Sequence, residues 1–138
     1  MLKEAWTLSI ETLSWIEMRR LSEPLALSRT VKQLAITDPN AVRMAHLLVS
    51  ETVRRQNFID QFINKIMKPS SLNEFNLGTQ AFLRLYVYQT RIAKNWPRAD
   101  FDEAENIVRL ARSILGWKTL QPVEPIRVRV AAMAGGGG

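Results

Sequence analysis

Apolar and polar positions follow one another along the chain with the period of a helix. Apolar side chains recur every three or four positions over residues 2–20, which predicts an amphipathic helix. These positions are Leu2, Ala5, Trp6, Ile10, Leu13 and Ile16. The same spacing predicts further helices over residues 24–36, 39–52, 57–67, 77–92 and 102–115. Period-two alternation is confined to residues 126–130, which is too short to build a sheet. The predicted fold class is therefore all-α, with about six helices in residues 2–116.

Polar residues and prolines mark where these helices begin and end. Pro24 suits the first helical position, and Asp38 can cap the amides of a helix that starts with Pro39. Asn57 is expected to cap the fourth helix, which ends in a loop at residues 68–71. Short connections of this kind favour antiparallel neighbours in a helical bundle.

The chain changes character after Leu120. Residues 121–125 are rich in proline, and the last four residues are glycines, which have no side chains to pack into a core. We expect one helical domain over residues 1–120, followed over residues 121–138 by an extended linker or a truncated or engineered tail. No signal-peptide core follows the first residue, and no apolar run reaches the ~18 residues of a membrane span. A cytoplasmic protein without a membrane partner is expected.

Residues that catalysis and metal binding need are scarce in this sequence. The chain has no Cys, which excludes a disulfide framework, a thiolate zinc site and a cysteine nucleophile. The single histidine, His46, has no convincing ligand three or four positions away, so a structural or surface role is expected. The acidic run at Asp100, Asp102, Glu103 and Glu105 falls in the first turn of a predicted helix, where carboxylates favour the helix dipole. We therefore expect neither an enzyme nor a cofactor-binding or metal-binding protein.

Positive charge is concentrated after residue 38. The chain carries 19 Lys and Arg against 13 Asp and Glu, a net charge of +6. Residues 1–38 are balanced, residues 39–72 carry five bases and two acids, and residues 73–138 carry nine bases and six acids. Such a field attracts nucleic-acid phosphates, which the Arg fork matches in geometry. The candidate RNA-binding side chains are Arg54, Arg55, Lys65, Lys68, Arg91, Lys94 and Arg98.

Three runs of residues resemble the NusB-like domain. They are residues 45–60 (AHLLVSETVRRQNFID), residues 82–89 (FLRLYVYQ) and residues 102–111 (DEAENIVRLA). The stretch from Asp38 to Leu120 is most similar to the version at the N-terminus of RNA cytosine-5 methyltransferases of the RsmB (Fmu/Sun) type, archaeal relatives included. The resemblance implies an all-α NusB-like helical bundle.

The chain also departs from that family. Its first helix begins with residues 1–6 (MLKEAW), where the antitermination NusB has an arginine-rich start that takes part in RNA binding. The family's acidic box reads DEA at residues 102–104, preceded by RAD at residues 98–100 in place of Pro-His-Ala. The sequence contains no methyltransferase catalytic domain, no Gly-rich cofactor loop and no catalytic Cys.

The resemblance and the charge together imply a function in RNA binding. We expect an accessory domain that holds structured RNA for an rRNA or tRNA cytosine-5 methyltransferase domain outside this chain, in cis or in trans. The alternative is a protein-interaction adaptor of the transcription-antitermination NusB type. A second copy of the chain, in a homodimer, is a further candidate partner. RNA helices are read mainly by shape and backbone, which scattered Lys and Arg can do. An exposed apolar patch would favour the adaptor.

Overall fold

The computed structural model describes residues 2–93, 109–110 and 112–115. The elements in this part are α1 (Leu2–Arg19), α2 (Glu23–Leu34), α3 (Pro39–Arg54), α4 (Gln56–Met67), the 3-10 helix η1 (Leu72–Glu74), α5 (Leu77–Val87) and the π-helical turn η2 (Tyr88–Ile92). Residues 109–110 and 112–115 are also helical, and the described residues contain no strand. The predicted all-α class is confirmed. The expected acidic helix start at residues 100–105 and the expected tail at residues 121–138 lie outside the described residues.

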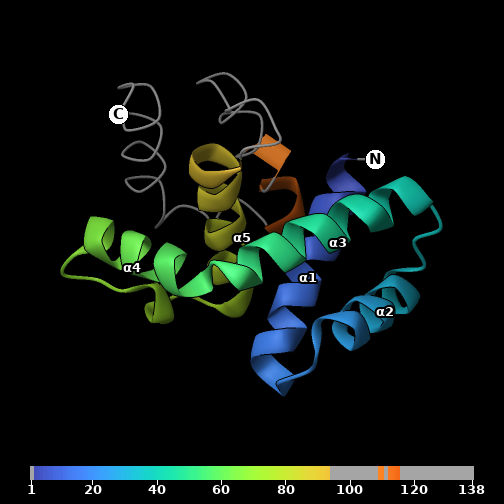
Figure 1. Cartoon of the computed structure of the whole chain (residues 1–138), viewed down its shortest axis with the longest axis horizontal. Coiled ribbons are helices and arrows are strands. Elements are labelled where there is room, and N and C mark those ends of the chain that lie inside the picture. Colours follow the sequence, from blue (N-terminus) through green and yellow to red (C-terminus); the bar gives the residue numbers. More distant parts are fainter. Residues whose placement is uncertain (1, 94–108, 111, 116–138) are drawn as a thin grey trace.

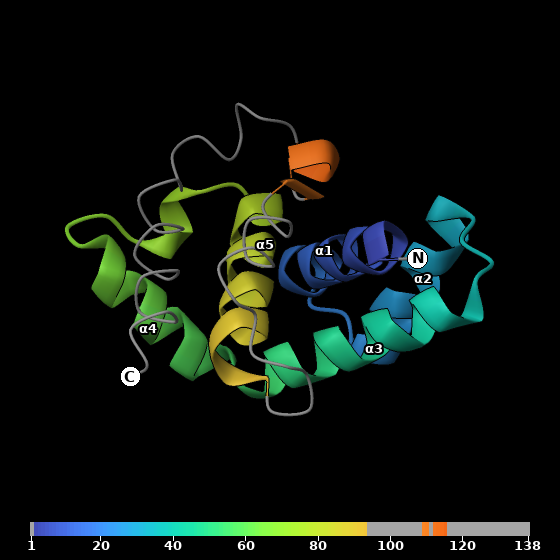
Figure 2. The same ribbon diagram turned by 90° about the horizontal axis from the view of Figure 1, so that it is seen from above.

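Helix α1 lies at the centre of the arrangement. It packs against α2, α3 and α5. Helices α3 and α4 follow one another along one side of the molecule, and α5 crosses behind the point where they meet (Figures 1 and 2). Helix α5 therefore touches α1, α3 and α4, and its side chains from Thr79 to Val87 are all buried.

The main core joins α1, α3, α4 and α5. It contains Trp6, Leu48, Ile59 and Phe82, one from each of these four helices. The Trp6 and Phe82 ring centroids lie 6.2 Å apart, and Phe82 stacks on Tyr86 at 5.6 Å. Aromatic pairs at these distances add to the free energy gained by burying apolar area. A smaller cluster, centred on Leu8, Leu27 and Ala45, joins α1, α2 and α3.

The helix starts agree with the sequence at one position and differ at two. The Asp38 carboxylate accepts the Asn40 N–H at 2.9 Å, so the predicted cap is confirmed. Pro24 is the second residue of α2, one position later than predicted, because the helix begins at Glu23. The prediction that Asn57 caps the fourth helix is wrong, since α4 begins at Gln56 without a side-chain cap.

Two large apolar residues within the predicted helices are exposed. The exposed fraction is 55% for Leu25 and 62% for Phe58. Each directly precedes a fully buried residue, Ala26 or Ile59. One position turns a helix by about 100°, so the residue before a buried one can point out of the core.

The predicted long helix over residues 77–92 changes its winding near the end. After Val87 the chain continues as η2, where the Ala93 N–H donates to the Tyr88 carbonyl five residues earlier at 2.9 Å. Both tyrosines of this stretch, Tyr86 and Tyr88, are buried. Tyr88 lies beside the joint between α3 and α4, where Arg55 covers its ring.

Candidate nucleic-acid interface

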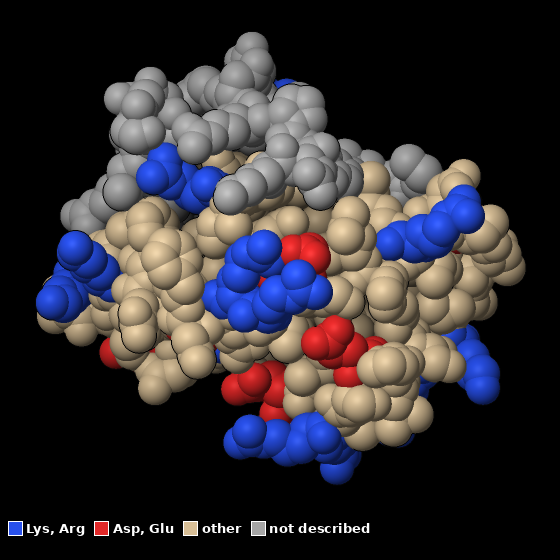
Figure 3. Space-filling view, viewed as in Figure 1, with Lys and Arg blue, Asp and Glu red and all other residues tan. Residues whose placement is uncertain are grey.

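The structure describes five of the seven predicted RNA-binding residues. Arg54 ends α3 and Arg55 forms the joint between α3 and α4, while Lys65 lies on α4 and Lys68 directly after it. Arg91 lies in η2. Lys94 and Arg98 lie outside the described residues. Figure 3 shows Lys and Arg side chains gathered in separate groups along the α3–α4 side, with carboxylates beside the central group.

Arg54 and Arg55 share one carboxylate. Arg54 Nη1 lies 3.5 Å from Glu51 Oε1, and Arg55 Nη1 contacts Glu51 Oε2 and donates to the Glu51 carbonyl at 3.2 Å. The exposed fraction is 68% for the Arg54 side chain and 36% for that of Arg55. Arg54 is therefore the more available of the two for an external phosphate, and Arg55 is largely engaged within the protein.

Arg55 also covers Tyr88 of η2. Its guanidinium carbon lies 5.8 Å from the Tyr88 ring centroid, within the range of a cation–π contact. Burial raises the pKa of the Tyr88 hydroxyl, the Glu51 carboxylate raises it too, and the guanidinium groups of Arg55 and Arg54 oppose the shift. Glu51, Arg54, Arg55 and Tyr88 thus form one electrostatically coupled group at the α3–α4 joint.

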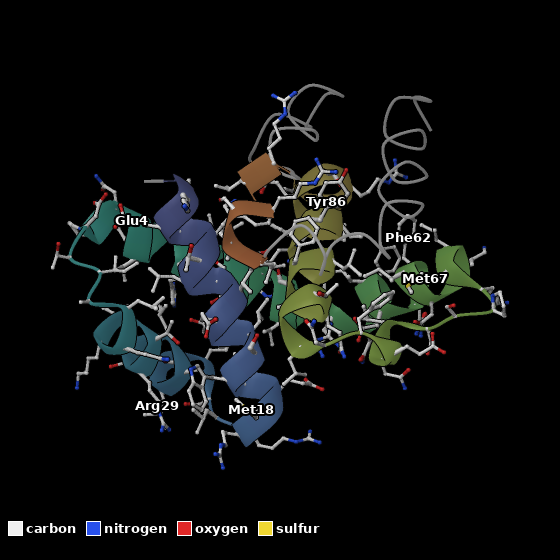
Figure 4. The ribbon with its side chains drawn as sticks, turned by 180° about the vertical axis from the view of Figure 1, so that it is seen from behind. Glu4, Met18, Arg29, Phe62, Met67 and Tyr86 are labelled. Carbon is white, nitrogen blue, oxygen red and sulfur yellow. The ribbon has the colours of Figure 1, made fainter. Side chains whose placement is uncertain are left out.

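A second cation–π contact joins η2 to α4, and here the arginine comes from η2 and the aromatic ring from α4. Arg91 of η2 lies over the Phe62 ring of α4, 6.0 Å from its centroid. Phe62 lies on the side of α4 that faces α5 and η2 (Figure 4). Arg55 at the start of α4 therefore covers a ring of η2, and Arg91 of η2 covers a ring of α4.

We call these residues and the phenylalanine between them the α4–η2 strip. It is made of Arg55, Phe58, Phe62, Tyr88 and Arg91. The three residues from the α4 side follow at spacings of three and four, which places them on one face of a helix. Phe58 is an apolar residue within the helix predicted over residues 57–67, and helical periodicity alone did not indicate that its ring would be exposed.

Next to the strip, α4 presents a polar outer side. Gln61, Lys65 and Lys68 are exposed. Lys65 follows Phe58 by seven residues, or about two helical turns, and so lies on the same side of α4. Arg91 lies over Phe62 of the same helix, and Arg54 is the last residue of the preceding helix, α3.

Arg84 belongs to the predicted family-like run but does not face solvent. Its Nε donates to Asp60 Oδ1 at 2.8 Å and its Nη2 donates to Asp60 Oδ2 at 3.1 Å. The pair joins α5 to α4 and uses both oxygens of Asp60. Asp60 therefore does not add an unpaired negative charge to the surface of α4.

A separate group of cations lies where α1 meets α2. Arg29 lies over the Trp15 ring at 4.6 Å, and Trp15 Nε1 donates to the Gln33 side chain at 3.1 Å. Arg29 and Met18 lie at the same end of the molecule (Figure 4). This group comes from residues 1–38, which are neutral overall, so it is not part of the predicted interface.

The described residues contain no candidate metal-binding site. No cluster of three or more His, Asp or Glu side chains occurs there, and His46 is exposed on α3. None of the helices in the same residues is long and apolar enough to cross a membrane.

Known proteins share both the sequence pattern and the fold. The sequence model of the NusB family matches residues 5–114, whereas no curated protein matches the chain. A chain in the crystal structure of a plectonemic RNA supercoil is 21% identical, with a TM-score of 0.80 over 96% of this chain and 94% of that chain. A chain in the crystal structure of the antitermination factors NusB and NusE in complex with double-stranded RNA is 20% identical, with a TM-score of 0.78 over 96% of each. At these identities the likeness of the structures establishes the fold.

Proposed function

Because the chain belongs to the NusB family, we propose that it is a non-catalytic RNA-binding protein whose α4–η2 strip and adjoining Lys and Arg hold RNA phosphates. The observation that carries the proposal is that Arg54, Lys65 and Lys68 are exposed at the end of α3 and along α4, and that Arg91 lies over Phe62 of α4. The structural likeness to the antitermination factors NusB and NusE with double-stranded RNA supports the same function.

The balance of charge on this side supports phosphate binding. Glu51 and Asp60 are the acidic residues of α3 and α4, and each is already paired with arginine. Arg54 and Lys65 extend into solvent beside them. Their long-range field would attract a polyanion, and each phosphate contact would release counterions from the RNA.

A role in antitermination is the finer function that the comparisons favour. The matching family is NusB, and one structural neighbour is the complex of NusB and NusE with RNA. The association with an RNA cytosine-5 methyltransferase rests only on the three sequence runs, so it is the second candidate. A binding assay with purified NusE and, separately, with a methyltransferase catalytic domain would distinguish the two roles. Binding to NusE alone would favour the antitermination role.

RNA affinity measured against salt tests the main proposal. The wild-type protein should bind a structured RNA at low salt, and the logarithm of its affinity should fall linearly with the logarithm of salt concentration. The double variant Arg54→Gln/Lys65→Gln removes two exposed cations and should lower this slope by about one to two units. The matched control is Lys3→Gln/Lys32→Gln, which removes two exposed cations from α1 and α2.

Two results would contradict the proposal. One is the failure of the wild-type protein to bind structured RNA at low salt. The other is an equal loss of slope in both double variants, which would mean that the RNA responds to net charge and not to this side of the molecule.

A further inference from the structure

We propose that Phe58 is a stacking platform for an unpaired RNA base, which makes the α4–η2 strip selective for RNA with unpaired nucleotides. This inference rests on the proposed function, because it assumes that the strip binds RNA. It assigns a separate task to one residue that carries no charge.

Phe58 is exposed although its helix is well anchored. Among the exposed large apolar side chains of the described residues it has the largest exposed fraction, above Leu25, Met18 and Leu47. The neighbouring Ile59 is fully buried, so α4 is held in place without any contribution from the Phe58 ring. The ring is therefore presented to solvent on a fixed helix.

Cations flank this ring on the same face of α4. Arg55 precedes it by three residues and lies over Tyr88, and Phe62 follows it by four residues under Arg91. The row from Arg55 to Phe62 spans about 10 Å of helix axis. A base stacked on Phe58 would lie on the side of α4 that also carries the exposed Lys65, about two turns further along the helix.

Two exposed amide side chains lie next to Phe58 on α4. Asn57 and Gln61 are exposed beside it, and amide side chains can donate to and accept from the edge of a base. The carboxylate of Glu51 is paired with Arg54 and Arg55, so its repulsion of the RNA backbone is reduced.

This setting fits a nucleobase better than an apolar protein surface. A protein docking site requires a contiguous apolar patch, whereas Phe58 lies among amides and cations. An exposed aromatic ring beside basic side chains is an arrangement by which proteins bind unpaired bases, since every base has a face that can stack.

Two RNAs and three variants test the platform. The RNAs are a hairpin with an unpaired adenosine tail and a fully paired duplex with the same number of phosphates. Phe58→Leu keeps an apolar side chain but removes the aromatic face, and Phe58→Trp keeps an aromatic face. Leu25→Ala truncates another exposed apolar residue, on α2, as the matched control.

The expected result is selective. Phe58→Leu should weaken binding to the tailed hairpin by about 5- to 100-fold, the range of one lost base–aromatic stack, and leave binding to the duplex unchanged. Phe58→Trp should bind both RNAs as the wild type does, and Leu25→Ala should have no effect on either. All variants should keep the helical circular dichroism spectrum of the wild type.

Failure of the platform and failure of the proposed function give different results. If Phe58→Leu binds the tailed hairpin as tightly as the wild type while Arg54→Gln/Lys65→Gln binds weakly, the platform is overturned and RNA binding stands. An equal loss for both RNAs in Phe58→Leu would also overturn it, because stacking on an unpaired base cannot weaken a paired duplex. If the wild type binds neither RNA, the proposed function fails and the platform with it.

Discussion

Arg84 and Asp60 connect α5 to α4 through two parallel hydrogen bonds of 2.8 and 3.1 Å. The two side chains are not equally buried, since the exposed fraction is 8% for Arg84 and 26% for Asp60. A charge that loses its partner is costly in proportion to how little water can reach it. The pair therefore holds in place the helix that carries Phe58 and Lys65.

The unequal burial predicts unequal effects of breaking the pair. Asp60→Ala leaves the buried guanidinium of Arg84 unpaired and should lower the free energy of unfolding by about 3 kcal/mol. Arg84→Met leaves a carboxylate that water can partly reach, and the thioether chain refills part of the space, so the loss should be about 1–2 kcal/mol. Urea unfolding of both variants measures the difference. Equal losses would show that burial does not control the cost at this pair.

Adjacent arginines at the α3–α4 joint should also differ in their effect on stability. Arg55→Gln removes the contacts to Glu51 and Tyr88 and should cost about 1 kcal/mol. Arg54→Gln removes only a distant ion pair of a mostly exposed side chain, so its cost should stay below about 0.5 kcal/mol. Chemical denaturation of the two single variants tests this. A larger loss for Arg54→Gln would contradict the assignment of Arg55 to the protein and Arg54 to the RNA.

Local signals in the sequence were sufficient for most of the fold. Helical spacing identified the residues of α1 and α3, and Asp38 caps α3 as its position before Pro39 predicts, because capping depends on neighbours within one turn. The exposed position of Phe58 could not be predicted, since helical periodicity locates the edge of an apolar face only to within one residue.

Contacts between distant residues explain the rest of the difference. In the sequence Arg84 is one more basic residue of its run. Its partner Asp60 lies 24 positions earlier, and only the packing of α5 on α4 brings the two side chains together. The two cation–π contacts across the α4–η2 strip arise in the same way, because each joins residues that lie about 30 positions apart in the sequence and meet only through tertiary packing. The charge pattern identified which residues are basic but not which of them are already paired.

Tyr88 predicts a dependence of stability on alkaline pH. Its pKa is raised in the folded protein, so the unfolded chain releases this proton first as the pH increases. The free energy of unfolding should therefore be unaffected below the ordinary tyrosine pKa of about 10, and it should fall as the pH rises from there through the pKa of the folded state. Tyr88→Phe should lose this part of the decline in urea titrations at successive pH values.

The charged neighbours of Tyr88 offer a check on the cause. Glu51→Gln removes a group that raises the pKa of Tyr88 and should lower it, whereas Arg55→Gln removes a group that lowers this pKa and should raise it. Ultraviolet absorbance of the tyrosinate follows the titration directly. Shifts in the same direction for both variants would refute the electrostatic coupling at the joint.

Two asparagines distinguish a real helix cap from an apparent one. Asn76 precedes α5, and its side-chain oxygen accepts the Thr79 N–H at 2.8 Å. Asn76→Ala leaves that amide without its partner at the start of a buried helix, so it should lower the free energy of unfolding by about 1–2 kcal/mol. Asn57 has the sequence context of a cap but lies inside the first turn of α4. Asn57→Ala should be neutral or stabilise the protein by up to about 0.5 kcal/mol, because Ala favours the helix. Thermal or urea unfolding of the two variants provides the comparison, and a greater loss from Asn57→Ala would mean that Asn57 caps α4 and that the helix begins at Phe58, two residues later than the structure places it.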